Sequence, residues 1–355
     1  MYDVIIAGAG VAGCQIARLL DDSGLDTLVL EKEKNIRIKD SGIVSSEFLD
    51  FFPKYLIAKN IDSMDIVSPS GIEINLSLPE PFAHIVHRES FSGYLRRKIK
   101  IDYETVIAAK FYEESVTVLT DKGFHECKLL VGCDGANSVI RNAAGIERPG
   151  LCAGIFSRGR KSTGNVTVYM NKFFSPDFFA WHIPQNGEHG LITAMRPAGH
   201  MDEFETALGL EQGNLYGAHI PIGLQKSFSS RCLLAGDAAS QVKPLTGGGI
   251  IFSLKAAKHA AETIRKAAKK NRFDAAFLSS YQKRWLGEFG AEIRKQMMIR
   301  NVYRRLPNKH IDQLFSAFKP DFEKIRAFNY DRLSKLCWKL PKLKMLRFLP
   351  WLLVR

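Results

Sequence analysis

Three glycines near the start of the chain have the spacing of a phosphate-binding turn. Gly8, Gly10 and Gly13 follow an apolar run at residues 3–7 and precede residues with helical spacing. In such a turn the first glycine permits a tight bend, the second lets a pyrophosphate approach the backbone, and the third lets the helix pack on the strand. The N–H groups at the start of the helix attract phosphate. The pattern therefore predicts a dinucleotide site.

An acidic residue closes the next strand. The apolar run 27–30 ends at Glu31, whose carboxylate is suited to accept hydrogen bonds from ribose hydroxyls. An acid at this position disfavours the 2′-phosphate of NADP. We expect Lys32 beside it, and Val11 and Ala12 in the glycine turn, to contact the same dinucleotide.

Two later apolar runs also end in carboxylates. Asp134 closes the run that begins at residue 128, and Gly236 and Asp237 close the run that begins at residue 231. If these runs are parallel strands, their ends meet the glycine turn at one edge of the sheet. A carboxylate there suits a polyol chain, which offers hydroxyl donors. FAD has such a chain, its ribityl group, and NAD has none, so these residues favour FAD.

In this order the motifs resemble those of the p-hydroxybenzoate-hydroxylase-type flavoproteins and, within that superfamily, the geranylgeranyl reductase family. The resemblance covers the chain from residue 1 to about 270. Residues 133–138 with Arg141 match the family's Asp-Gly motif, and residues 234–239 match its Gly-Asp motif. Further matching residues are Arg88 with Phe91 and Leu95, then Pro244, Gly247, Gly248, Gly249 and Ile250.

The resemblance implies a role for each of these positions. Asp237 would hold the ribityl chain, and Arg88 would reach the FAD. The N–H groups of 247–249 would face the pyrimidine edge of the flavin. The helix that starts near Ile250 would stabilise negative charge on the reduced ring.

A short aromatic segment is the expected substrate wall. Phe179, Trp181, Ile183 and Pro184 resemble the YxWxFP motif of geranylgeranyl reductases, with Phe for Tyr and Ile for Phe. Alternating apolar residues of this kind would line a long pocket for a polyprenyl tail. They also fit the ordinary core of an antiparallel strand, and they resemble the WxWxIP motif of flavin-dependent halogenases.

One position departs from the family. Archaeal and plant reductases tend to carry Cys in a Pro-Cys-Gly loop after the second strand, where this chain has Ser41. We expect Ser41 to contact the flavin or the substrate. We predict reduction of geranylgeranyl double bonds by hydride from flavin N5. The alternatives are a flavin monooxygenase or halogenase, and a non-catalytic flavin- or lipid-binding protein.

The sequence identifies no proton donor and no metal site. His182 lies in the aromatic segment, but strand alternation turns it away from a pocket that Trp181 faces. It is a weak catalytic candidate. The electron donor stays open among NAD(P)H, a ferredoxin and a deazaflavin, because no second glycine turn of this kind is present.

Charge and composition suggest where the protein works. The formal charge is +13, and residues 333–355 alternate Leu, Trp and Phe with Lys and Arg. Such a stretch suits an acidic membrane surface, although it could also pack back on the protein. Scattered cysteines and an immediate strand after Met1 predict a cytoplasmic protein with no signal peptide, with peripheral contact to the inner membrane surface. We expect no nucleic-acid partner, because the basic residues carry no known binding motif.

These residues require a discontinuous α/β architecture to bring them together. We predict a Rossmann-like FAD-binding domain formed by 1–65, 84–149 and 226–272. Residues 66–83 and 150–225 would form an antiparallel substrate-binding domain, since they carry short strand patterns with many aromatic residues and glycines. A basic helical C-terminal region would occupy 273–355.

Overall fold

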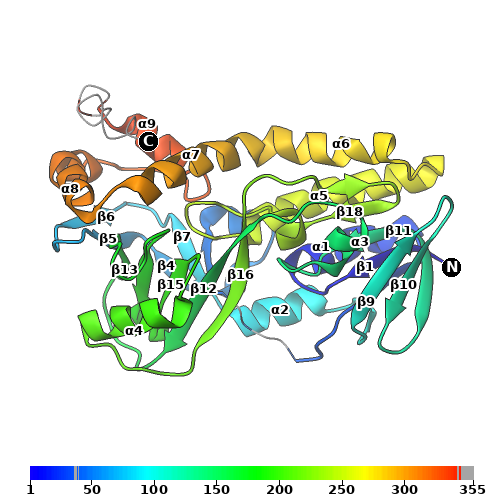
Figure 1. The fold of residues 1–355 in the computed structure, drawn as a ribbon, viewed down its shortest axis with the longest axis horizontal. Coiled ribbons are helices and arrows are strands. Elements are labelled where there is room, and N and C mark those ends of the chain that lie inside the picture. Colours follow the sequence, from blue (N-terminus) through cyan, green and yellow to red (C-terminus); the bar gives the residue numbers. More distant parts are fainter. Residues whose placement is uncertain (36–37, 39, 342–343, 345–355) are drawn as a thin grey trace.

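The computed structural model describes residues 1–35, 38, 40–341 and 344. Within this part of the chain, two large sheets lie side by side, and long helices pass over both of them (Figure 1). The architecture is the mixed α/β fold predicted from the sequence.

The first sheet has eight strands among the described residues and carries the glycine turn. Its strands are β1 (Tyr2–Ala7), β2 (Thr27–Leu30), β8 (Ile101–Asp102), β9 (Val106–Phe111), β10 (Val116–Thr120), β11 (Phe124–Gly132), β17 (Phe228–Ser229) and β18 (Cys232–Leu234). Strand β1 pairs in parallel with β2 and β11, and β11 pairs in parallel with β18. The carboxyl ends of these strands therefore meet at one edge, as the positions of Glu31, Asp134 and Asp237 required.

The second sheet is mostly antiparallel. Among the described residues it has seven strands, in the order β16-β12-β15-β14-β13-β5-β6. They are β5 (Ser63–Val67), β6 (Glu73–Ser77), β12 (Gly150–Arg158), β13 (Val166–Tyr169), β14 (Ala180–Ile183), β15 (Glu188–Thr193) and β16 (Tyr216–Ile222). A small sheet of β3 (Ile43–Ser45), β4 (Ile57–Ile61) and β7 (Ala83–Val86) completes the strands.

The helices cover these sheets and connect them. They are α1 (Val11–Leu20), α2 (Arg88–Arg96), α3 (Val139–Ala143), α4 (Pro197–Leu208), α5 (Ile250–Lys270), α6 (Ala275–Trp285), α7 (Ala291–Arg305), α8 (Asn308–Phe322) and α9 (Ser334–Lys339). A π-helical segment, Leu286–Gly290, joins α6 to α7, and 3₁₀ turns occupy Asp21–Ser23, Ser46–Asp50, Lys54–Leu56, Pro184–Asn186 and Gly236–Ala239. Figure 1 shows α5 and α6 above the first sheet, with α7 and α8 continuing over the second sheet.

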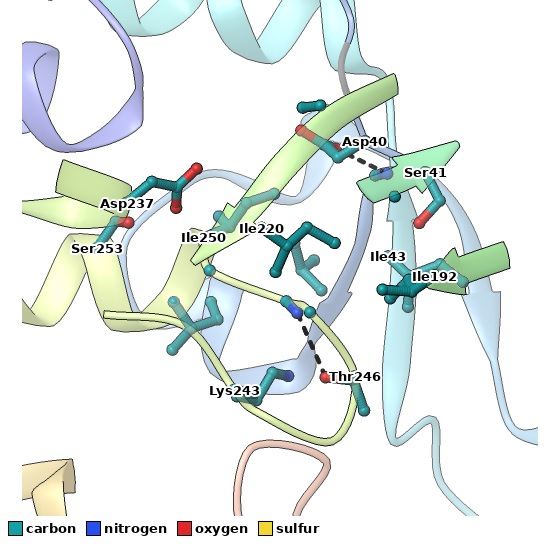
Figure 2. Close-up of a pocket in the computed structure, with 18 of the residues that line it drawn as sticks. Asp40, Ser41, Ile43, Ile192, Ile220, Asp237, Lys243, Thr246, Ile250 and Ser253 are labelled. Carbon is teal, nitrogen blue, oxygen red and sulfur yellow. Dashed lines mark hydrogen bonds between the residues drawn. The ribbon is translucent and has the colours of Figure 1, made fainter. Parts of the chain in front are cut away.

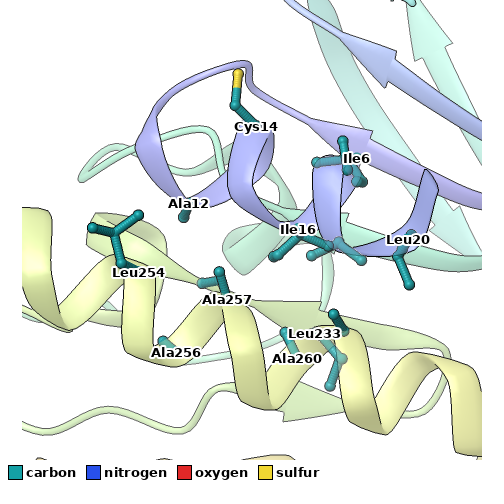
Figure 3. Close-up of a cluster of buried hydrophobic side chains, with 14 of the residues drawn as sticks. Ile6, Ala12, Cys14, Ile16, Leu20, Leu233, Leu254, Ala256, Ala257 and Ala260 are labelled. Carbon is teal, nitrogen blue, oxygen red and sulfur yellow. The ribbon is translucent and has the colours of Figure 1, made fainter. Parts of the chain in front are cut away.

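Close packing of α1 on α5 brings two helix starts together. Ile16 and Leu20 of α1 face Ala257 and Ala260 of α5, and all four side chains are buried (Figure 3). Small alanines let the two helix backbones approach, and burial of the larger side chains stabilises each contact by roughly 1.5–3 kcal/mol. The N-termini of both helices consequently open toward the same side of the sheet.

No helix in the described part of the chain is long and apolar enough to cross a membrane. The five cysteines that the structure describes are all free thiols.

Candidate functional site

One large cavity joins the two sheets. Its volume is about 1010 Å³. It begins at the glycine turn after β1, passes the loop before α5, and continues between the second sheet and α7–α9. Of the expected cofactor residues, those on its wall are Gly8, Gly10, Val11, Ala12, Glu31, Lys32, Arg88, Asp134, Gly236, Asp237, Gly247, Gly248, Gly249 and Ile250. Residues from six separate stretches of sequence thus share one wall.

The three glycines of the turn are required for different reasons. A Cβ on Gly13 would lie 1.9 Å from the Gly8 carbonyl oxygen, so this position has no room for a side chain. Gly8 has a φ of +104°, and a Cβ there would lie 2.4 Å from the carbonyl oxygen of Cys133. A Cβ on Gly10 would meet nothing within 4 Å. The protein itself therefore does not require glycine at Gly10, whereas a phosphate against that backbone would.

Glu31 fastens the glycine turn to the second strand. Its Oε2 accepts a hydrogen bond from the Ala9 N–H at 2.8 Å, and its Oε1 accepts one from the Glu33 N–H at 3.1 Å. Arg96 lies 3.9 Å from Oε2. The carboxylate is held at the cavity wall in one orientation, as ribose recognition would require.

Asp134 has its carboxylate engaged within the fold. Oδ1 accepts from the Ser138 hydroxyl at 2.6 Å, and Oδ2 accepts from the Val139 N–H at 2.7 Å and the Ile140 N–H at 3.2 Å. Burial raises the pKa of Asp134, and these hydrogen bonds oppose that rise. Asp134 thus holds the start of α3 while it also lies on the cavity wall.

Arg141 ties the two strand-end loops together. It is buried and lies behind the cavity wall, where its guanidinium donates to the Ala136 carbonyl at 2.6 Å and to the Ala238 carbonyl at 3.2 Å. This cross-link fixes the position of the Asp134 loop relative to the Asp237 loop.

The loop before α5 presents a row of glycines beside Asp237. Gly247 has a φ of +70°, and a Cβ on Gly249 would lie 3.1 Å from the Asp237 Oδ1. The Gly248 N–H donates to the Thr246 hydroxyl at 3.4 Å. Figure 2 shows Asp237 on one side of this part of the cavity and Ser41 on the other. Pro244, expected at the cofactor, is buried and does not line the cavity, although both of its neighbours do.

Arg88 carries nitrogens that the described protein leaves unpaired. Its Nη2 donates to the Asp40 carboxylate at 2.6 Å, but its buried Nε and Nη1 have no hydrogen-bond partner among the described residues. Burying such donors is costly unless a ligand satisfies them. Ser41 follows Asp40 and also lies on the cavity wall.

This part of the cavity fits FAD. A pyrophosphate, a ribityl chain and a flavin ring would find three suitable features here. These are the open face of Gly10, the row of glycines beside Asp237 and the two unpaired nitrogens of Arg88. Gly13 contributes by packing alone, since it does not line the cavity.

The structure divides the expected substrate segment in two. Phe179 and Trp181 lie on the cavity wall. Ile183 and Pro184 are buried but are not among the described residues that line the cavity. Alternation would place Ile183 on the same face as Trp181, but β14 ends at Ile183 and the 3₁₀ turn Pro184–Asn186 begins there. His182 also lies off the wall, as alternation predicted, and burial lowers its pKa.

A buried carboxyl group stands behind Trp181. The Trp181 Nε1–H donates to the Glu188 Oε1 at 3.3 Å, and Arg158 lies 3.6 Å from Oε2. Burial raises the pKa of Glu188 to about 7, and the contacts with Trp181 and Arg158 oppose that rise. This hydrogen bond fixes the indole plane on the cavity wall.

Most of the apolar wall was not identified from the sequence. It comes from β4–β7, β13, the helices α7–α9 and the segments that join these elements. Its residues include Ile61, Met64, Ile66, Ile74, Leu76, Phe82, Val166, Val168, Val302, Leu306, Leu314, Phe315, Phe318, Phe322, Phe328, Leu333, Leu336 and Leu340. The alternation of apolar residues in β6 could have predicted a strand with one face on the cavity. The apolar spacing of the helices could not, because it is the same for a helix that lines a cavity and for one that packs in a core.

The start of the expected membrane segment is part of this wall. Leu333, Leu336 and Leu340 line the cavity, so they pack inward against the protein. Further along, the Lys344 Nζ lies 2.6 Å from the Asp321 Oδ2 of α8, so this residue also packs against the protein. The residues of the segment at 342–343 and 345–355 lie outside the described residues.

A buried ion pair beneath the glycine loop was also missed. The Lys243 Nζ lies 2.7 Å from the Asp331 Oδ1, and the Ser45 hydroxyl donates to Oδ2. The Lys243 ammonium lies 4.2 Å from the centroid of the Tyr330 ring. Lys243 and Tyr330 both line the cavity, so the ammonium end of this ion pair lies beside the glycine loop.

Known proteins similar to this chain share both its length and its fold. The chain is 27% identical over 371 residues to a digeranylgeranylglycerophospholipid reductase of Methanothermobacter thermautotrophicus, covering 94% of this chain and 96% of the relative. A geranylgeranyl bacteriochlorophyll reductase-like protein from Thermoplasma acidophilum superposes with a TM-score of 0.85 and 17% identity, covering 99% of both chains. A flavin-dependent brominase superposes with a TM-score of 0.67 and 16% identity, covering 95% of this chain and 98% of its own. No family model matches the sequence.

Proposed function

The chain belongs to the geranylgeranyl reductase family of FAD-dependent oxidoreductases, and we propose that it reduces carbon–carbon double bonds of a geranylgeranyl chain on a lipid or lipid precursor. The observation that carries this proposal is the continuity of the cavity. The glycine-lined part opens directly into a chamber of aliphatic and aromatic side chains. A polyprenyl chain matches the apolar character of such a chamber.

FAD supplies the hydride for alkene reduction from N5 of its reduced ring. We propose that the glycine turn and Glu31 hold its adenosine half, that Asp237 holds its ribityl chain, and that Arg88 uses its unpaired nitrogens on the cofactor. The Lys243 ammonium and the N-terminus of α5 place positive charge beside the glycine loop. Positive charge there stabilises negative charge that develops on a bound ring.

The chamber orients the alkene and excludes water. Phe179 and Trp181 form one wall, and the Glu188 carboxyl group holds the indole of Trp181 in place. An isolated alkene has no polar group to anchor it, so its orientation depends on the shape of this wall. Ser41 lies on the wall, at the position where the family resemblance implies Cys. We propose that its hydroxyl faces the flavin or the substrate.

Reduction is tested most directly without the natural electron donor. We expect FAD-loaded protein, reduced with dithionite in the absence of oxygen, to convert a digeranylgeranylglycerophospholipid into products heavier by two hydrogen atoms per double bond. Mass spectrometry of the extracted lipid measures this change. Asp237→Ala is the matched control, because it should lose FAD and with it the conversion.

The same measurement separates the alternatives. Products that gain oxygen in air, or halogen when halide is added, would identify a monooxygenase or halogenase and overturn the reductase proposal. Comparison of NADH, NADPH, reduced ferredoxin and reduced deazaflavin as donors would then identify the physiological reductant.

We propose that the end of the chain contacts an acidic membrane surface. Leu333, Leu336 and Leu340 connect this end to the cavity wall, so a lipid could pass from a bilayer into the chamber beside it. Removal of residues 345–355 should abolish co-sedimentation with vesicles rich in phosphatidylglycerol and leave FAD content unchanged. Unaltered sedimentation of the shortened protein would contradict the membrane contact.

A further inference from the structure

Tyr330 lies where the glycine loop meets the apolar chamber. It is located between α8 and α9 and lines the cavity. The centroid of its ring lies 6.4 Å from that of Phe82, which packs in turn on Phe328, and both phenylalanines line the chamber. The Lys243 ammonium lies 4.2 Å from the centroid of the Tyr330 ring. Tyr330 therefore contacts both the apolar wall and the loop before α5.

Lys243 connects this ring to the glycines that are expected to face the flavin. The Lys243 N–H donates to the Gly248 carbonyl at 3.0 Å, and the Gly247 N–H donates to the Lys243 carbonyl at 2.9 Å. A Cβ on Gly248 would lie 2.8 Å from the Lys243 Cε, so the lysine side chain runs along the loop, where Figure 2 shows it near Thr246. Tyr330 is thus separated from the expected flavin site by one side chain.

The Tyr330 hydroxyl is available as a proton donor. It forms no hydrogen bond with another residue in the described part of the chain. Burial raises the pKa of Tyr330, Asp331 adds to that rise, and Lys243 opposes it. The phenol therefore keeps its proton at neutral pH. The ammonium beside it would stabilise the phenolate that remains once the proton has left.

Neighbouring groups with transferable protons are less suited to this task. The Lys243 ammonium lies 2.7 Å from the Asp331 carboxylate, and loss of its proton would break that ion pair. Ser41 and Thr246 carry aliphatic hydroxyls, which are far weaker acids than a phenol. His219 also lines the cavity, but it is exposed to solvent. The phenol combines acidity, a free hydroxyl and a place on the apolar wall.

We propose that Tyr330 is the acid that protonates the substrate double bond. One alkene carbon takes the hydride that the reduced flavin supplies, and the other takes the proton of the Tyr330 hydroxyl. The electron pair of the hydride forms one new C–H bond, and the electron pair of the broken π bond forms the other. The flavin is oxidised by two electrons as the alkene is reduced, and the phenolate beside Lys243 recovers a proton from solvent when the product leaves. The inference rests on the proposed function and supplies the proton donor that this reaction needs.

A single turnover tests this role. FAD-loaded protein is reduced without oxygen, separated from the reductant and mixed with a digeranylgeranylglycerophospholipid, and the absorbance of oxidised flavin is followed. We expect Tyr330→Phe, which removes only the hydroxyl, to slow this reoxidation about 100- to 10,000-fold. FAD content, Tm and the Kd of the fully saturated form of the same lipid should not change, because the ring remains. Tyr55→Phe is the matched control, since it makes the same change at a residue that is 67% exposed.

The pH dependence is a second measurement of the same role. The single-turnover rate of the unaltered protein should fall at alkaline pH as Tyr330 loses its proton, and the rate of Tyr330→Phe should not show this fall. The charged groups that act on Tyr330 in the described part of the chain are Lys243 and Asp331. Both are present in the two proteins, so the comparison isolates the phenol.

The possible outcomes separate this role from the proposed function. Equal single-turnover rates for the unaltered protein and Tyr330→Phe would overturn the role and leave the proposed function intact. A Tyr330→Phe protein that loses FAD, or whose affinity for the saturated lipid falls as much as its rate, would show a structural role and also overturn the inference. If the unaltered protein converts no lipid, the proposed function fails and the proton donor fails with it.

Discussion

Replacing Gly13 with alanine is expected to destroy the cofactor site and to destabilise the whole protein. The added Cβ would lie 1.9 Å from the Gly8 carbonyl oxygen and 3.2 Å from the Cys133 Cβ. Because the obstacle is backbone that cannot rotate away, α1 must move off the sheet. Overpacking of this kind typically costs about 1–3 kcal/mol and can cost more when backbone must shift. We expect a lower Tm and protein purified without yellow colour.

The neighbouring Gly10 supplies the sharpest control for this prediction. It has a φ of −80°, which alanine adopts freely, and a Cβ there would meet no atom within 4 Å. Gly10→Ala should therefore keep the Tm of the FAD-free protein and weaken only FAD binding. Calorimetric Tm and flavin absorbance per protein separate the two effects. A Gly13→Ala protein with full FAD and unchanged Tm would contradict the packing argument.

The second large effect concerns the ion pair beneath the glycine loop. Lys243 and Asp331 are 5% and 1% exposed, and Asp331 also accepts a hydrogen bond from Ser45. Asp331→Asn should destabilise the protein by about 3–5 kcal/mol, because the neutral amide leaves the charge of a buried ammonium uncompensated. Urea unfolding followed by circular dichroism measures the change in free energy.

An exposed pair and a double variant show whether burial is the cause. Lys319 and Glu323 are 3.8 Å apart and about equally exposed, so Glu323→Gln should cost no more than about 1 kcal/mol. Lys243→Met with Asp331→Leu removes both charges and should be more stable than Asp331→Asn alone. If the double variant is the less stable of the two, unpaired charge is not what destabilises the single variant.

Short-range patterns explain why so many residues of the glycine-lined part of the cavity could be predicted to lie together. Gly8 and Gly13 are required for steric reasons that arise within one strand, turn and helix. The spacing of the glycines in the sequence is therefore enough to predict the turn. Asp134 and Asp237 could be placed at one sheet edge because strands that are buried on both faces are usually parallel. The sequence did not show that the Asp134 carboxylate also secures the start of α3, since that depends on side-chain orientation.

The substrate side was less predictable because its wall is assembled from distant elements. Trp181 could be identified from strand alternation, but its companions come from β4–β7 and from helices more than a hundred residues later in the chain. The spacing of apolar residues along α8 is the same whether that face of the helix meets a core or a cavity. The contact between Lys243 and Tyr330 is visible only when the surrounding atoms are placed, because the two residues lie far apart in the sequence.

The glycine turn at Gly8–Gly13 and its acidic partner Glu31 were therefore determined by the sequence alone, together with the preference for FAD. Their geometry is set within about thirty residues, where spacing and steric limits leave one solution. Tertiary structure alone decided which residues line the apolar chamber and which buried polar atoms have partners. Those features depend on the docking of α7–α9 against the second sheet, and burial and pairing at such a contact are properties of the assembled fold.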